Sequence, residues 1–210
     1  MAKTDPVLRR GLYLVTPDWT DTGRLVAMLP ALLATRPALL QYRNKLADAA
    51  LRRVQVAGLL PLCRAAGVPL VINDDLALAL ECGADGVHLG RDDGDLAAAR
   101  AALGPHRLLG VSCYAEWPRA EAAAAAGADY LAFGAMFPSS TKPSAPPAPL
   151  ALLGRAKAAF GRPVAAIGGI TVDNAPLLRA AGADLLAVIS DVFSAPDPAA
   201  RAAAYGRLFD

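Results

Sequence analysis

One short run of the sequence carries the side chains of an anion site. In Gln41-Tyr42-Arg43-Asn44-Lys45, every second residue from Gln41 is polar, and two of these are cations. Side chains of an extended chain alternate between two faces, so Gln41, Arg43 and Lys45 would point the same way. Two cations beside an amide suit a polyanionic ligand. An equally open interpretation is that Arg43 pairs with a nearby acid and that Lys45 is solvated.

Four aspartates could supply ligands for a hard divalent cation. Asp74 and Asp75 follow one apolar run, and Asp92 and Asp93 follow the next. Mg²⁺ takes one or two carboxylates together with substrate phosphates, whereas Asp is also a preferred N-cap of helices. We predict that Asp74 and Asp93 bind a metal and that Asp75 and Asp92 are caps.

Small and hydroxyl residues later in the chain could form a second anion site. Gly168-Gly169 and Ser190 each stand at the end of an apolar run. Backbone N–H groups of such turns can surround a phosphate, although a Gly-Gly pair can also serve only a tight turn. Ser112 ends another run without an adjacent His–acid pair that would activate it, so we predict a hydrogen-bond donor to a ligand. His88, inside a run, is interpreted as a buried structural residue.

Eight short apolar runs would have to position these residues. They are nearly continuous in hydrophobicity, as is typical of parallel strands covered on both faces. The predicted strands are Leu12–Val15, Leu39–Arg43, Leu70–Asn73, Val87–Leu89, Leu108–Ser112, Tyr130–Gly134, Val164–Ile167 and Leu185–Ser190. Helical stretches separate them, for example Asp48–Ala66, Asp95–Leu103 and Ala120–Ala126.

A repeated junction indicates how strands and helices are connected. The tripeptide Gly-Ala-Asp occurs at 83–85, 127–129 and 182–184, each time after a helical stretch and before a strand. Repeated helix–Gly–strand junctions indicate a parallel sheet of βα units. We predict an α/β fold, a (β/α)₈ TIM barrel forming a single domain over residues 1–210. The alternative, an open doubly wound sheet, lacks its G-x-G-x-x-G after the first strand.

The segment from Met136 to Pro149 differs from the rest, with five prolines from Pro138 onward. Proline disfavours helix, so this is predicted to be an irregular loop after the sixth strand. Active sites of these barrels lie at the C-terminal strand ends and the loops that follow. Lys142 of this loop would then join Arg43, Lys45, Asp74 and Asp93 in a clamp for a diphosphate. Clamp and glycine site together suggest an enzyme that joins two phosphorylated molecules.

Composition excludes several other classes of function. The chain has 210 residues and a formal net charge of +2, which is not the electrostatic footprint of a nucleic-acid binder. No run approaches the ~18 apolar residues of a membrane span. Three separated cysteines without a C-x-x-C fit reduced thiols. We expect a cytoplasmic protein that binds neither nucleic acid nor membrane.

Several motifs together resemble the thiamine-phosphate synthase family. They run in order from about residue 11 to residue 194 and are specific only in combination. The matching segments are Gly11–Pro17, Gln41–Lys45, Val71–Asp75, Gly83–Gly90, Gly134–Pro143 and Ala166–Ile170. The resemblance implies a barrel that couples hydroxymethylpyrimidine diphosphate to hydroxyethylthiazole phosphate and releases pyrophosphate with Mg²⁺ bound.

The resemblance also implies roles for individual residues. Asp74 and Asp93 would hold Mg²⁺, and Arg43, Lys142 and Ser112 would act on the reacting diphosphate. The pyrimidine diphosphate site would comprise Gln41, Arg43, Lys45, Asn73, Ser112 and Lys142. The thiazole phosphate site would comprise Ser139, Thr141, Gly168, Gly169, Ile189 and Ser190. The chemistry would be dissociative: pyrophosphate leaves, and the thiazole nitrogen captures a pyrimidine methylene cation.

Two alternatives remain beside the synthase. A related thiazole tautomerase isomerises a thiazole carboxylate phosphate without a diphosphate partner, and it would not need the charged clamp. A non-catalytic sensor of phosphate ligands would bind without turnover.

The sequence also departs from the family pattern, with Arg91 where Gln is frequent and Asn44 where Glu is common.

Overall fold

Eight parallel strands close into a barrel in the computed structural model, which describes residues 8–138 and 147–210. Each strand pairs with the next along the chain, and β1 pairs with β8 to close the circle, Leu12 lying opposite Leu186. The strands are β1 (Gly11–Val15), β2 (Leu39–Tyr42), β3 (Leu70–Asn73), β4 (Gly86–Leu89), β5 (Leu108–Tyr114), β6 (Tyr130–Phe133), β7 (Val164–Ile167) and β8 (Leu185–Val188). The predicted (β/α)₈ barrel is confirmed.

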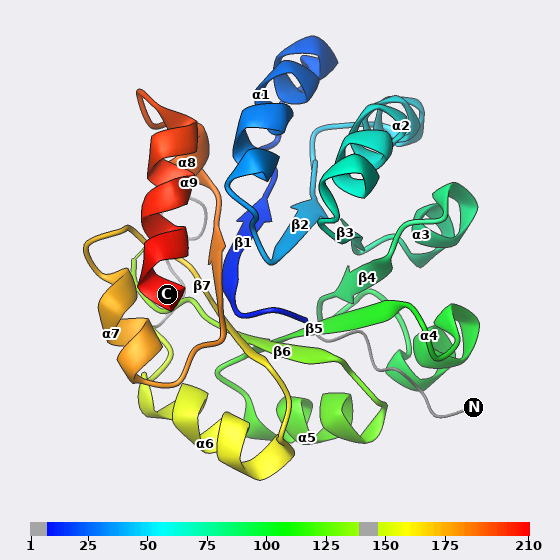
Figure 1. The fold of residues 1–210 in the computed structure, drawn as a ribbon. Helices are drawn as coiled ribbons and strands as arrows, with labels where there is room; N and C mark the ends of the chain where they lie inside the picture. Colours follow the sequence, from blue (N-terminus) through cyan, green and yellow to red (C-terminus); the bar gives the residue numbers. More distant parts are fainter. Residues whose placement is uncertain (1–7, 139–146) are drawn as a thin grey trace.

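Helices follow the strands and surround the barrel on its outside (Figure 1). They are α1 (Thr22–Ala34), α2 (Ala49–Ala66), α3 (Leu76–Cys82), α4 (Leu96–Leu103), α5 (Trp117–Ala125), α6 (Ala151–Phe160), α7 (Ala175–Ala180), α8 (Ser190–Phe193) and α9 (Pro198–Gly206), with a final 3₁₀ turn over Arg207–Phe209. No helix of the described residues is both long and apolar enough to cross a membrane.

Alternation along the strands divides the core into two layers. In β1, Leu12 and Leu14 belong to the cluster that packs against the helices, whereas Tyr13 and Val15 belong to the cluster inside the barrel. The inner cluster draws alanines from β6, β7 and β8, including Ala132. Small side chains at these inner positions leave space above them, and a cavity opens there.

Aspartates cap five of the helices at their N-termini. Each accepts a hydrogen bond from the backbone N–H three residues further on, which satisfies a donor that the helix itself cannot use. The caps are Asp21, Asp48, Asp75, Asp95 and Asp197. The predicted cap Asp75 is confirmed. The predicted cap Asp92 is wrong, because α4 begins only at Leu96 and Asp95 takes that role.

The Gly-Ala-Asp junctions stabilise the N-terminal end of the barrel. Gly83 ends α3 in the left-handed conformation (φ 67°), which costs glycine little. The aspartates then accept from backbone N–H groups of the preceding strand: Asp85 from Leu70 at 2.8 Å and Asp129 from Leu109 at 2.7 Å. The repeat is therefore a device that ties neighbouring strands together.

Six strand boundaries differ from the sequence prediction. β1 and β4 begin one residue earlier, β5 runs two residues further, to Tyr114, and β2, β6 and β8 end one or two residues sooner. The second strand ends at Tyr42, so the extended conformation does not continue through Arg43 to Lys45. The eighth strand ends at Val188, and Ser190 begins the short helix α8. Apolar runs here continue beyond the hydrogen-bonded ladder into the loops that build the site.

Candidate active site

A cavity of about 710 Å³ opens at the C-terminal ends of the strands. All the sequence-predicted site residues that the structure describes line it. They are Gln41, Arg43, Lys45, Asn73, Asp74, Asp93, Ser112, Gly168, Gly169, Ile189 and Ser190. Ser139, Thr141 and Lys142 lie outside the described residues. Residues from strands that are far apart in sequence thus meet around one space.

Arg43 is held in place by the loop after β1. Its Nη1 donates to Asp18 Oδ2 at 2.8 Å, and the Thr16 hydroxyl donates to the Arg43 carbonyl at 2.7 Å. Asp18 also accepts from the Lys45 backbone N–H at 2.6 Å. Arg43 therefore pairs with an acid, as one interpretation of this run predicts. It also lines the cavity, as the interpretation of the run as an anion site requires. Sequence reasoning missed Asp18, although its place just after a strand end was a usable signal.

Asp74 and Asp93 bring two carboxyl groups together at the mouth of the cavity. Burial, a hydrogen bond to Asp74 and the charge of Asp74 raise the pKa of Asp93, against the Gly90 N–H and the Lys45 charge. Gly90 N donates to Asp93 Oδ2 at 2.7 Å, and Lys45 Nζ lies 3.3 Å from Asp74 Oδ2. A divalent cation would relieve the repulsion between two adjacent carboxylates, and their oxygen donors fit Mg²⁺.

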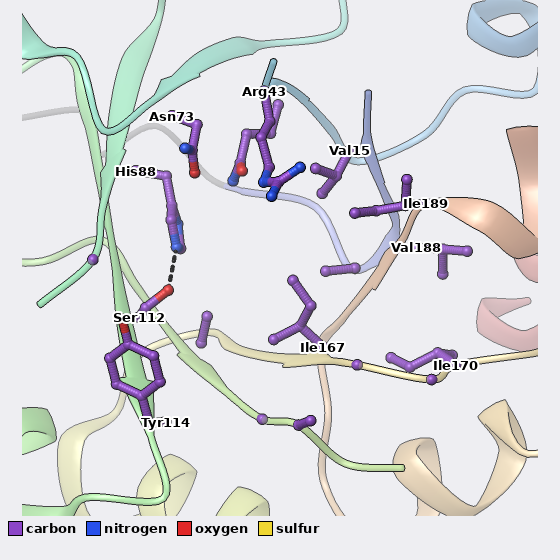
Figure 2. A pocket seen from close by; sticks show the side chains of 18 of the residues that line it. Val15, Arg43, Asn73, His88, Ser112, Tyr114, Ile167, Ile170, Val188 and Ile189 are labelled. Atoms are coloured by element: carbon purple, nitrogen blue, oxygen red, sulfur yellow. Dashed lines mark hydrogen bonds between the residues drawn. The ribbon is translucent and has the colours of Figure 1, made fainter. Parts of the chain in front are cut away.

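One wall of the cavity is polar and carries a His–Ser contact. His88 Nε2 lies 2.8 Å from Ser112 Oγ, drawn as the dashed line in Figure 2, with Asn73 on the same side. Burial lowers the pKa of His88 to about 4, against the charge of Asp74. Arg119 fixes the backbone here, donating from Nε to the Ser112 carbonyl at 2.6 Å. The expected structural role of His88 is supported, and it also reaches the cavity wall.

The opposite wall is apolar. Figure 2 shows Ile167, Ile170, Val188 and Ile189 on this side, with Val15 beside them. Such a surface offers no hydrogen bonds, so it suits the flat face of an organic ring and excludes water from it. The cavity thus combines charged groups at its mouth with one polar and one apolar wall.

Gly168 and Gly169 bring bare backbone to the edge of the cavity. Both have positive φ, 102° and 62°. A Cβ on Gly169 would lie 2.3 Å from the Pro138 carbonyl oxygen, so glycine is required where the loop after β6 approaches. The tight-turn interpretation is therefore supported. Helix α7 begins only at Ala175, because Thr171 and Asn174 first form a hydrogen-bonded turn.

Arg91 lies at the rim, where it departs from the family pattern. Its guanidinium contacts Glu116 and lies over the Tyr114 ring, 4.8 Å from the centroid. Its backbone N–H donates to the Tyr114 hydroxyl. These contacts direct the added positive charge toward Glu116. The Asn44 departure is also explained: Asn44 donates to the Trp19 carbonyl at 2.7 Å, which a carboxylate could not do.

Comparison with known proteins agrees with this geometry. The family model described as thiamine monophosphate synthase matches residues 12–192. The thiamine-phosphate synthase of Azoarcus sp. (strain BH72) is 68% identical over 200 residues, covering 95% of this chain and 97% of that protein. That of Aromatoleum aromaticum is 65% identical over 201 residues, covering 96% and 97%.

Solved structures give the same result. Thiamine phosphate pyrophosphorylase from Pyrococcus furiosus superposes with a TM-score of 0.84 at 30% identity, covering 96% of each chain. A 3-hexulose-6-phosphate synthase structure, with a TM-score of 0.69 at 20% identity over 94% of this chain and 99% of that one, shares the fold. The chain belongs to the thiamine monophosphate synthase family.

Proposed function

We propose that this protein is a transferase that couples a hydroxymethylpyrimidine diphosphate to hydroxyethylthiazole phosphate, forming thiamine phosphate and releasing pyrophosphate. The observation that carries the proposal is the cluster of opposite charges at one side of the cavity mouth. Arg43 and Lys45 supply cations, and Asp74 and Asp93 supply carboxylates beside them. Cations and a carboxylate pair are both needed when a diphosphate is bound together with a metal.

The diphosphate would bind between the cations and the carboxylate pair. Arg43 is the better ordered of the two cations, because its side chain is 16% exposed and held by Asp18, whereas that of Lys45 is 60% exposed. Arg43 would therefore place its remaining N–H donors in a fixed orientation. Positive charge fixed before the reaction stabilises negative charge that grows on a leaving group.

Asp74 and Asp93 would hold Mg²⁺. When bound, Mg²⁺ would neutralise the charge of the pyrophosphate as it leaves. Lys45 Nζ lies 3.3 Å from Asp74 Oδ2, and Asp93 accepts a hydrogen bond from the Gly90 N–H. Protein neighbours thus orient both carboxyl groups.

The second substrate would bind against the apolar wall. Gly168 and Gly169 would offer backbone N–H groups to its phosphate, and Ile189 and Ser190, just after β8, line the same cavity. The thiazole ring would pack on Ile167 and Ile189. By resemblance the proposal also extends to Ser139, Thr141 and Lys142, which lie outside the described residues.

We infer that the described side chains of this site position groups and contribute no nucleophile of their own. Burial lowers the pKa of His88, so its imidazole is neutral at physiological pH. Ser112 contacts Nε2 of this ring, and the other nitrogen, Nδ1, contacts the hydroxyl of Tyr130 and, among the described residues, no carboxylate. That is not the acid-backed pair which activates a serine. We infer that bond breaking is driven by stabilising the leaving pyrophosphate, and that the thiazole nitrogen attacks the methylene carbon.

Both proposed substrates are small molecules. We propose that the reaction takes place in the cytoplasm.

Pyrophosphate release tests the proposal. The purified protein is incubated with Mg²⁺ and the pyrimidine diphosphate, the thiazole phosphate, or both. We expect stoichiometric release of pyrophosphate and formation of thiamine phosphate only with both substrates. Isomerisation of a thiazole carboxylate phosphate without coupling would identify a tautomerase instead, and tight binding of either ligand without turnover would identify a sensor.

A further inference from the structure

Five hydrogen-bonded side chains cross the barrel interior directly beneath the cavity. Gln41 Nε2 contacts Tyr13 Oη, and the hydroxyls of Tyr13 and Tyr130 lie 2.7 Å apart. Tyr130 Oη lies 3.0 Å from His88 Nδ1, and His88 Nε2 lies 2.8 Å from Ser112 Oγ. This hydrogen-bonded chain of side chains joins Gln41 on β2 to Ser112 on β5, and both end residues line the cavity.

The two tyrosines do not reach the cavity themselves. Tyr13 is 1% exposed and Tyr130 is fully buried, and neither lines the cavity. Gly110 makes room for this arrangement, because a Cβ there would lie 2.1 Å from the Tyr130 ring. Burial raises the pKa of both phenols, so each keeps its proton at neutral pH. Among the described residues, the hydroxyls of Tyr13 and Tyr130 therefore bond only other members of this row of five side chains, and neither reaches the cavity.

The direction of the chain follows from counting donors. An amide nitrogen only donates, so Tyr13 Oη accepts from Gln41. Among the described contacts the proton of Tyr13 then has Tyr130 Oη as its one acceptor, so Tyr13 donates to Tyr130. Tyr130 must in turn donate to His88 Nδ1. A ring nitrogen that accepts carries no proton, so the proton of the neutral imidazole is on Nε2 and is donated to Ser112. The Ser112 hydroxyl proton is then free to point elsewhere.

We propose that Tyr13 and Tyr130 are positioning residues that fix the Nε2–H tautomer of His88 and thereby make Ser112 a hydrogen-bond donor toward the bound ligand. The inference rests on the proposed function only for the identity of that ligand, the pyrimidine diphosphate. The opposite direction would follow if Gln41 presented its amide oxygen to Tyr13. His88 would then carry its proton on Nδ1, and Ser112 would donate to His88 with no proton left for a ligand.

The tautomer of His88 decides between these two directions, and it can be measured on the free protein. The chain has two histidines, and exposed His106 provides a reference signal. In ¹⁵N-histidine-labelled protein at pH 7, we expect His88 to show a protonated Nε2 and an unprotonated Nδ1. A protonated Nδ1 would overturn the proposal. This measurement needs no substrate, so it stands or fails independently of the proposed function.

A double-mutant cycle tests whether the tyrosines act through Ser112. Tyr130→Phe should raise KM for the pyrimidine diphosphate by about two- to tenfold, the worth of one hydrogen bond, and leave KM for the thiazole phosphate unchanged. In a Ser112→Ala background the same change should have no further effect on KM, because the group that Tyr130 positions is gone. Effects that multiply in full would overturn the positioning role.

Tyr42→Phe is the matched control. Tyr42 is equally buried and donates to Gln55 at 2.8 Å, but it lies outside the chain of five side chains. It should lose stability comparable to Tyr130→Phe while keeping both KM values and the His88 tautomer. An equal rise of KM in the control would show that any buried hydroxyl near the barrel matters, and would overturn the assignment.

Discussion

Asp129 and Asp93 lie at opposite ends of the barrel and have opposite surroundings. At the N-terminal end, Asp129 accepts from the Leu109 N–H and pairs with Arg100, so its charge is fully compensated. At the C-terminal end, Asp93 faces a second carboxyl group, that of Asp74, and the pKa of Asp93 is raised, first by burial. The same residue type is thus a stabilising tie at one end and, at the other, a carboxyl group beside a like neighbour, which we propose as a metal ligand.

The other two aspartates of the Gly-Ala-Asp junctions are also held by protein partners, Asp184 by cations and Asp85 by backbone. Asp184 pairs with Lys157 at 2.6 Å and also contacts Arg10, and Asp85 accepts from the backbone of β3. At the C-terminal end, by contrast, the cations Arg43 and Lys45 border an open cavity. These cations pair with Asp18 and Asp74 and still line the cavity, so we propose that a ligand binds at this end.

The largest effect is expected at the C-terminal end, from Arg43→Met. Losing one charge-assisted donor to a developing anion costs on the order of 10²–10³ in rate. We expect pyrophosphate release to fall by about that factor while thiazole phosphate affinity is kept, because Gly168 and Gly169 lie on another strand end. Steady-state kinetics measure the first and titration calorimetry the second.

Arg53→Met is the control for this change. Arg53 forms an exposed ion pair with Glu81 at 2.8 Å, far from the cavity lining. Its loss should leave pyrophosphate release within twofold of the parent. Near-native release in Arg43→Met would remove Arg43 from the site.

At the N-terminal end, Asp129→Asn should affect stability instead of catalysis. The ion pair with Arg100 is mostly buried, with side-chain exposures of 13% and 19%, and removing one partner leaves the other uncompensated. We expect the free energy of unfolding to fall by about 2–4 kcal/mol, with pyrophosphate release unchanged well below the unfolding temperature. Urea denaturation gives the first value; a loss of activity in the folded variant would blur the distinction between the ends.

His88, between the two ends, predicts a pH dependence of stability. Its pKa is lowered to about 4 in the folded protein, against roughly 6.5 unfolded. Below pH 6.5 this imidazole is protonated in the unfolded chain, whereas in the folded protein it is protonated only near pH 4. The contribution of His88 to the free energy of unfolding is therefore full above pH 6.5 and is lost as the pH falls toward 4. At 1.36 kcal/mol per unit the loss approaches about 3 kcal/mol.

The variant His88→Gln isolates this contribution from that of the carboxylates. Glutamine can still bond both Tyr130 and Ser112 but does not titrate. Unfolding curves at pH 7 and pH 4.5 should converge for the two proteins at the lower pH. A parallel decline of both would assign the acid sensitivity to other groups.

The smallest effect is expected from Asp18→Asn, which acts on Arg43. Asparagine can still accept from the Lys45 N–H, but it weakens the contact at 2.8 Å that orients the Arg43 guanidinium. We expect kcat for pyrophosphate release to fall by about three- to tenfold, in line with a partly exposed charged hydrogen bond. The same change in the Arg43→Met background should do nothing more, and a further loss there would give Asp18 a role of its own.

Local sequence patterns predict most of the fold and identify the Gly-Ala-Asp junctions at the N-terminal end of the barrel. The apolar runs locate all eight strands, and the repeated Gly-Ala-Asp locates the junctions. What they could not give are contacts between distant residues. Asp18 lies 25 residues from Arg43, and Tyr13 lies 117 from Tyr130, so only the closed barrel brings them together. The prediction of Asp92 as a cap is wrong because Asp92, Asp93 and Asp95 all precede the same helix. Asp95 is the cap because it stands directly before Leu96, where the helix begins.

The central claim is that Asp74 and Asp93, unlike Asp129 at the other end of the barrel, serve a ligand at the expense of stability. Asp93→Asn and Asp129→Asn, measured side by side for unfolding free energy and Mg²⁺-dependent pyrophosphate release, test it most directly. Asp93→Asn removes repulsion with Asp74 and keeps an acceptor for Gly90, so it should unfold at the same or higher urea concentration while losing release and requiring more Mg²⁺. Asp129→Asn should do the reverse. Equal destabilisation by both changes, with unchanged Mg²⁺ dependence in Asp93→Asn, would contradict the account.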